Sequence, residues 1–493
     1  MTRTPWGLIV ILSGNLLCLL ALLLIPTEAL IVRTWVLVVL ATLTLVLYLG
    51  QRYSAGFITT VELMSSAGVL IAFLLPSLYL CSVDFDFLTD GNVSYRHLLP
   101  EVAYAALLGQ SFFFAGHALR IPRSDVTLFC KSRTPMMADL SVLDFARIFF
   151  ILVLVVWMAR ALLLLSGSYY HVFRSEFQEQ DVTAYSALAQ LGGLNLIVIS
   201  GAWLHAFARS GNAYGYRWMW FALVLTTGEL LWYLPSGSRE PVLFLGISIF
   251  ASYVLLRRRL PIKALVVAVP VAVGLIVVLG FYRGLIGDTA LSTRQIDYGN
   301  VAKSLLESES AIDEAVKSGA WLFVASRPSE ARPVAAILDG VPNVVPYQFG
   351  KTYLSVLWIP VPRLFYEDKP SINIPINKWF FTDDVGSSPL TLIGEGFLNF
   401  GWAGICTVGL LAGWLSGAYD RFMWIRMRSD PMGIWAAIYA GTSVIALRLY
   451  AQTLGIWLST FAKAVILAWL ITILARYLTF NSKLPADRSL PPG

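Results

Sequence analysis

Continuous apolar runs of about twenty residues recur along this chain, and they restrict the fold more than any other feature. A lipid bilayer cannot satisfy exposed backbone N–H and C=O groups, so segments that cross it must form helices or a closed barrel. The runs are continuous, which excludes the alternating pattern of barrel strands. Apolar residues make up 57% of the 493 positions and charged residues 13%, against about 25% charged in soluble proteins. An all-α polytopic membrane protein is predicted.

About twelve segments meet the length criterion for a transmembrane helix. The first is too long for the apolar core of a signal peptide and lacks an Ala-x-Ala cleavage site, so a retained span is expected. The predicted spans are 6–25, 31–49, 57–80, 98–118, 146–165, 185–207, 218–234, 241–256, 264–282, 391–415, 431–450 and 454–475. Residues 1–282 thus hold nine spans and residues 391–476 three, followed by a tail at 477–493.

The only long polar segment between predicted spans is the loop at 283–390. It carries charges of both signs, several prolines and many aromatic residues. The other polar connections are much shorter, so a compact subdomain outside the membrane is expected only here. Within the loop, Asp339–Gly340 followed by Pro342 predicts a turn.

The distribution of Lys and Arg sets the orientation. The connections on the side of the N-terminus hold most of them, including the run at 257–259. The short connections on the other side hold only Arg33, Arg96, Arg174 and Arg239. We therefore expect both termini in the cytoplasm and the large loop outside, which in a bacterial inner membrane means the periplasm.

Other features argue against several classes of site. Four scattered cysteines form no CxxC pair, so structural disulfides and a cysteine-ligated metal are not expected. The net charge of +6 is explained by the asymmetry of the connections and does not indicate nucleic-acid binding. An Asp84-Phe85-Asp86 motif alone is a weak metal signal. No metal and no cofactor are predicted.

Among the ionisable side chains within the predicted spans, six are singled out, because a charge inside a span costs roughly 2.5–3.5 kcal/mol by insertion scales. They are Glu62, Arg160, Glu229, Glu395, Arg448 and Lys463. All except Glu62 fall in the outer half or near the midplane, which suggests a polar cavity that opens outward beneath the large loop. The alternative is that each side chain reaches the interface or pairs structurally. Glu62, near the inner end, is predicted to be structural.

Two groups of arginines are candidates for binding an anion. The segment Pro235–Pro241 joins two spans and contains Arg239, whose guanidinium suits a phosphate, although an ordinary helical hairpin would look the same. The loop adds Arg327, Arg332 and Arg363, which lie beside prolines. Its aromatic residues suit stacking on sugars, and they equally suit a subdomain packed on a bilayer.

Short motifs around the large loop resemble those of bacterial oligosaccharide repeat-unit polymerases, the O-antigen polymerases of the Wzy type. The motifs are Ser236–Arg239, Phe281–Gly284, Gly350–Leu354, Ile359–Phe365, Asp368–Pro370 and Ile393–Gly401 with Gly404. The resemblance implies a GT-C-like membrane glycosyltransferase. Its substrates would be an oligosaccharide donor and acceptor linked to undecaprenyl diphosphate, and a chain-length regulator is left open as a further partner.

This chemistry requires stabilisation of a diphosphate leaving group, which arginines provide without a metal. Arg239 and Arg363 are predicted to be catalytic, with Glu395 as first choice for the general base or for an orienter of an arginine, and Glu229 as second. Contacts to the diphosphate or sugar are predicted for Arg160, Arg283, Arg327, Arg332, Tyr353, Lys369 and Arg448.

Two alternatives stay open. An O-antigen ligase would use the same donor, but such enzymes rely on a histidine in the large outer loop, and this loop has none. A flippase or transporter for lipid-linked oligosaccharides would predict internal repeats and broken helices.

Overall fold

The structure is a computed structural model of the 493-residue chain. Apart from a few isolated positions, it describes residues 6–54, 58–82, 89–90, 93–120, 142–166, 191–208, 213–233, 239–257, 330–358, 390–429 and 433–481. The described chain is helical except for one small hairpin, in which β1 (Thr89–Asp90) pairs antiparallel with β2 (Val93–Ser94).

Eight helical segments are long and apolar enough to cross a membrane, judged by length and composition. They are Trp6–Leu24, Thr27–Ser54, Thr60–Cys81, Arg96–Arg120, Ile148–Leu165, Glu240–Arg257, Leu392–Met427 and Ile434–Ala451. Each overlaps one of the twelve predicted spans. The fold is therefore that of a multi-pass helical membrane protein.

The other four predicted spans have different outcomes. Helices α12 (Ala213–Tyr233) and α23 (Leu454–Asn481) occupy two of these positions, and α11 (Asn195–Ala208) is a shorter apolar helix at a third. The span predicted at 264–282 lies almost entirely outside the described residues.

The first part of the bundle contains α1 (Trp6–Leu24), α2 (Leu30–Ser54), α3 (Thr60–Val69), α4 (Leu75–Ser82) and α5 (Leu99–Arg120). A five-residue π-helical turn, η2 (Leu70–Leu74), joins α3 to α4. Thr59 caps α3: its hydroxyl accepts the N–H of Glu62, and the Glu62 carboxylate accepts the N–H of Thr59. This capping box fixes Glu62 at the first turn of α3.

The second part contains α8 (Val142–Leu165), α11, α12 and α13 (Arg239–Arg257), followed by α18 (Ala331–Gly340) and α19 (Lys351–Trp358) in the large loop. The predicted turn after Asp339–Gly340 is confirmed, since α18 ends at Gly340. The C-terminal part contains α21 (Leu392–Ser429), α22 (Ile434–Ser443), the 3-10 helix η6 (Val444–Ala451) and α23.

Helices α5 and α21 run parallel and pack closely along a seam of glycines. A Cβ on Gly409 would lie 2.4 Å from the carbonyl oxygen of Gly109, and one on Gly413 would lie 1.9 Å from that of Phe113. A Cβ on Gly417 would lie 2.8 Å from the carbonyl oxygen of His117. Small residues four apart allow this approach of two backbones, as in other membrane helix pairs.

The prediction of one continuous span at 391–415 was wrong in two respects. Helix α21 continues to Ser429, and it is interrupted at Phe400 and Gly401, where Gly401 has φ +62°. Gly396 and Gly404 would be about 12 Å apart along a straight helix. Here a Cβ on Gly404 would lie 1.9 Å from the carbonyl oxygen of Gly396, so the chain turns back sharply at Gly401.

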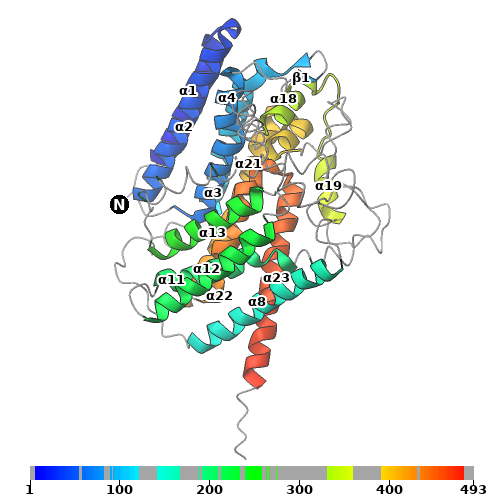
Figure 1. Ribbon diagram of the computed structural model, residues 1–493. Helices are drawn as coiled ribbons and strands as arrows, with labels where there is room; N and C mark the ends of the chain where they lie inside the picture. Colours follow the sequence, from blue (N-terminus) through cyan, green and yellow to red (C-terminus); the bar gives the residue numbers. More distant parts are fainter. Residues whose placement is uncertain are drawn as a thin grey trace, which may run out of the picture.

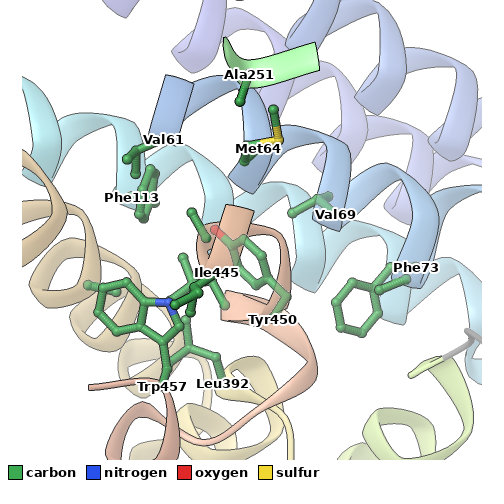
Figure 2. Packing of buried hydrophobic residues seen from close by; sticks show 14 of the residues in the cluster. Val61, Met64, Val69, Phe73, Phe113, Ala251, Leu392, Ile445, Tyr450 and Trp457 are labelled. Carbon is green, nitrogen blue, oxygen red and sulfur yellow. The ribbon is translucent and has the colours of Figure 1, made fainter. Parts of the chain in front are cut away.

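Figure 1 shows α18 beside β1, at the same end of the molecule as the turn between α1 and α2, and α19 below them at the side of the molecule. We call the end that holds α18 and β1 the loop end. The opposite ends of α2, α5 and α21, with the start of α3, form the far end. Figure 2 shows Tyr450 pointing toward the helices that carry Met64 and Phe73, with Leu392 and Trp457 together nearby.

Candidate functional site at the loop end

The described part of the large loop is attached to the bundle at two places. The first is the residue before α18, where the N–H of Glu330 donates to the carbonyl oxygen of Ala72 at 3.0 Å. Ala72 lies in the π-helical turn η2, and such turns are frequent at functional sites. Helix α18 then packs against α5 and α21, and a Cβ on Gly394 would lie 2.7 Å from Cδ1 of Ile337.

The second attachment is made by Asn399, which is fully buried on α21. Its Nδ2 donates to the hydroxyl of Thr352 and to the carbonyl oxygen of Glu395, both at 2.7 Å. Its Oδ1 accepts the N–H of Gly350 at 2.7 Å. Phe349 and Gly350 have positive φ values of 44° and 86°, so the start of α19 is held in an uncommon conformation directly against the break in α21.

Glu395 lies between α19, α21 and α23 and is 2% exposed. Its Oε2 accepts the N–H of Leu454, the first residue of α23, at 2.8 Å, and Thr352 also hydrogen-bonds to the carboxylate. The N-terminus of a helix favours a negative charge. Glu395, the first choice for the general base, is therefore a carboxylate whose hydrogen bonds join α19 of the large loop to the start of α23.

Tyr353, predicted to contact substrate, is half-buried on α19 next to this group. Burial and the nearby charge of Glu395 raise its pKa above the usual range, although a hydrogen bond with Asn399 acts in the opposite direction. Tyr353 therefore remains a neutral phenol that can donate a hydrogen bond.

Arg448 lies in η6, six residues before Leu454 in the chain. Its guanidinium forms a two-point ion pair with Glu240, in the first turn of α13, and lies 4.9 Å from the ring centre of Phe244. The side chains of Arg448 and Glu240 are 30% and 48% exposed. This ion pair is therefore only partly buried.

Glu330 was not selected from the sequence. It is half-buried, and burial together with the charge of Glu240 raises its pKa to about 8. A carboxyl group whose pKa lies near neutrality is suited to accept a proton in catalysis. No sequence pattern marks this residue, because its environment depends on how α18 packs.

Arg160 and Glu229, predicted for separate roles, are partners in a different cluster. The guanidinium binds both oxygens of the carboxylate, one of them at 2.7 Å from Nη2. Asn195 donates to Glu229 at 2.7 Å and to the Tyr233 hydroxyl at 3.1 Å. The rings of Trp157 and Trp232 lie 5.2 and 4.9 Å from the guanidinium carbon. This buried pair on α8 and α12 matches the structural alternative considered for these charges.

The five outer charged groups thus do not meet at one point. Glu395 binds the start of α23, Arg448 pairs with Glu240, Arg160 pairs with Glu229, and Lys463 is exposed. Arg332 is half-buried in the first turn of α18. Arg239 begins α13, but its side chain lies outside the described residues, as do Arg283, Arg327, Arg363 and Lys369. Asp84 and Asp86 also lie outside them.

In the described ranges, no group of three or more His, Cys, Asp or Glu side chains has the geometry of a metal site. What the loop end does offer is a buried carboxylate on a helix N-terminus, a second carboxyl of raised pKa, a phenol and an arginine. These groups can accept a proton and bind an anion.

A helical bundle with these apolar segments is that of a multi-pass membrane protein, with a group of polar side chains near the described part of residues 283–390. Residues 193–416 match a family described as a domain of unknown function (DUF8712). The match extends from α11 into α21 and includes the large loop, Glu229, Arg239 and Glu395, but it ends before Asp420 and Arg448. No curated protein and no solved structure matches the chain.

Proposed function

We propose that this protein is a membrane glycosyltransferase that polymerises oligosaccharide repeat units linked to undecaprenyl diphosphate at the periplasmic face of a bacterial inner membrane. The proposal is carried by one observation: α18 and α19 close onto the loop end over the buried Glu395 and beside the Arg448–Glu240 pair. Two of the motifs that resemble those of repeat-unit polymerases, Gly350–Leu354 and Ile393–Gly401, lie at this place.

In the proposed reaction, a hydroxyl oxygen of the acceptor unit attacks the anomeric carbon of the donor chain. The bond from that carbon to the diphosphate breaks, and the diphosphate leaves with the electron pair. The hydroxyl proton passes to a carboxylate. The largest requirement is positive charge at the diphosphate, which Arg448 would supply after exchanging Glu240 for it, together with Arg239, Arg332 and other basic residues predicted in the loop.

Two carboxyl groups are candidates for the base, and their surroundings differ. Glu395 already accepts hydrogen bonds from Leu454 and Thr352, which suits a residue that positions α19 and α23. Glu330 is half-buried, and burial together with the charge of Glu240 raises its pKa to about 8, which also suits a proton acceptor. We therefore propose Glu395 and Glu330 as the two candidates for the base, with Glu395 also positioning α19 and α23.

One observation favours the transporter alternative. Helix α21 is broken at Phe400–Gly401, and broken helices are typical of transporters, where they line a substrate site. The two functions are separated by the product that accumulates when the protein is absent.

The experiment is deletion of the gene followed by analysis of surface polysaccharide. Loss of polymer with single repeat units still transferred supports polymerisation. Lipid-linked units trapped in the cytoplasmic leaflet would instead show flipping, and full-length polymer left on its carrier would show ligation. Complementation with Arg239→Ala should fail to restore chain extension, whereas Arg257→Ala, exposed at the other end of the same helix, should restore it.

A further inference from the structure

A second group of buried ionisable side chains lies at the far end, away from the proposed site. Glu62 on α3, His117 on α5 and Asp420 on α21 are each 0% exposed. Nδ1 of His117 lies 3.2 Å from Oε1 of Glu62, and its Nε2 lies 2.7 Å from Oδ2 of Asp420. The imidazole thus bridges two carboxyl groups on two other helices, and the ring of Phe113 stacks against it at 6.0 Å.

The remaining oxygens of both carboxyl groups already accept hydrogen bonds. Oε2 of Glu62 accepts the N–H of Thr59 at 3.0 Å, and Oε1 also accepts from Arg52 at 3.0 Å. Oδ1 of Asp420 accepts the hydroxyl of Tyr439 at 2.9 Å. Each carboxyl group is therefore surrounded by donors, as expected for an ionised carboxylate.

A neutral imidazole has one N–H donor and one bare nitrogen. In this arrangement the bare nitrogen would face a carboxylate oxygen, lone pair against lone pair. An imidazolium donates from Nε2 to Asp420 and places the positive charge of its Nδ1–H 3.2 Å from Oε1 of Glu62, an ion pair without hydrogen-bond geometry. The charge balance leads to the same conclusion, because two carboxylates face Arg52 and a neutral imidazole would leave a net negative charge buried. The other titratable side chains at the cluster, Tyr48 and Tyr439, are neutral phenols.

The geometry points to a proton-binding site at the far end, in which His117 is protonated and lies as an imidazolium between the carboxylates of Glu62 and Asp420. The proton joins α3, α5 and α21, and Arg52 and Tyr439 connect the site to α2 and α22. Of the four charged members, Arg52 has a side chain that is 20% exposed, and the side chains of the other three are fully buried. This site does not depend on the proposed transferase activity.

The protonation state can be measured directly, since the chain has only four histidines. The full-length protein in nanodiscs, labelled with ¹⁵N-histidine, is examined at pH 8, well above the ordinary imidazole pKa of about 6.5. A triple variant with His97, His171 and His205 changed to Gln leaves His117 as the single signal without altering the cluster. We expect both ring nitrogens to carry hydrogen. A spectrum of the neutral imidazole, with one bare nitrogen, would overturn the proposal.

A thermal-unfolding comparison gives a second test that does not need the triple variant. His117→Gln removes the positive charge and leaves two carboxylates facing Arg52, so it should lower Tm. Adding Asp420→Asn restores neutrality, so the double variant should unfold at a higher temperature than His117→Gln alone. Asp420→Asn alone should instead lower Tm, because it leaves Arg52 and the imidazolium facing a single carboxylate. If Asp420→Asn has the same effect on Tm in the wild-type protein as in the His117→Gln variant, the histidine carries no charge and the assignment fails.

Discussion

The glycine seam between α5 and α21 gives the sharpest stability prediction. A Cβ on Gly413 would lie 1.9 Å from the carbonyl oxygen of Phe113, about 1.5 Å short of the 3.4 Å at which ordinary contact begins. The obstacle is backbone in the middle of a helix, so it cannot rotate away. Gly413→Ala must therefore separate the two helices, and overpacking of this kind costs about 1–3 kcal/mol.

The chain offers a matched control. Gly246 is also a glycine within a membrane-spanning helix, α13, and a Cβ there would meet nothing within 4 Å. Gly246→Ala should stabilise the protein by about 0.5–1 kcal/mol, because alanine restricts the unfolded chain more than glycine does. The assay is thermal unfolding of both variants in the same detergent. A Gly413→Ala variant as stable as Gly246→Ala would show that the seam is not closely packed.

Three further predictions concern the polar groups. Burial and the charge of Glu240 raise the pKa of Glu330 from 4.5 to about 8, so the contribution of this carboxyl group to stability is full below pH 4.5 and is lost as the pH rises through about 8. The Tm of Glu330→Gln relative to wild type should therefore rise over this pH range. A difference in Tm that stays constant with pH would contradict the raised pKa. Asn399→Ala removes the hydrogen bonds to Thr352 and Gly350, so it should lower the free energy of unfolding by about 1–3 kcal/mol and speed amide hydrogen exchange at the start of α19. Unchanged exchange would mean that other contacts hold this part of the loop. Arg160→Met leaves Glu229 buried without its partner and should lower the free energy of unfolding by about 3–5 kcal/mol. Adding Glu229→Met should recover most of the lost Tm. No recovery in the double variant would mean that the two side chains do not depend on each other.

Much of the fold could be predicted from the sequence because the bilayer imposes one simple length rule. Eight of the twelve predicted spans coincide with helices long enough to cross. The break in α21 could not be predicted, since it depends on the φ of Gly401, and the same residue would fit a continuous helix. Because the span was predicted to end at residue 415, Asp420 was not predicted to be a buried charge, although α21 continues past it and places it inside the bundle.

The sequence could predict that buried charges pair, but not which residues are partners. Buried ions were expected either to line a cavity or to pair, but which residues pair depends on how each helix is rotated and placed. Arg160 and Glu229 are 69 residues apart, and Arg448 and Glu240 are 208 apart. His117 was missed for the same reason: it is the third residue of a cluster whose other members come from α3 and α21.

The two polar clusters on α21 lie toward opposite ends of the longer segment that follows its break. Helical rise over the residues from Gly401 to Asp420 is roughly 28 Å at 1.5 Å per residue. Because the chain turns back at Gly401 and Gly396 lies against Gly404, Glu395 lies beside the first turns of this segment, and Asp420 lies toward its other end. The uncharged polar contacts in between, from Gln110 to Ser65, Ser66 and Tyr450, satisfy one another.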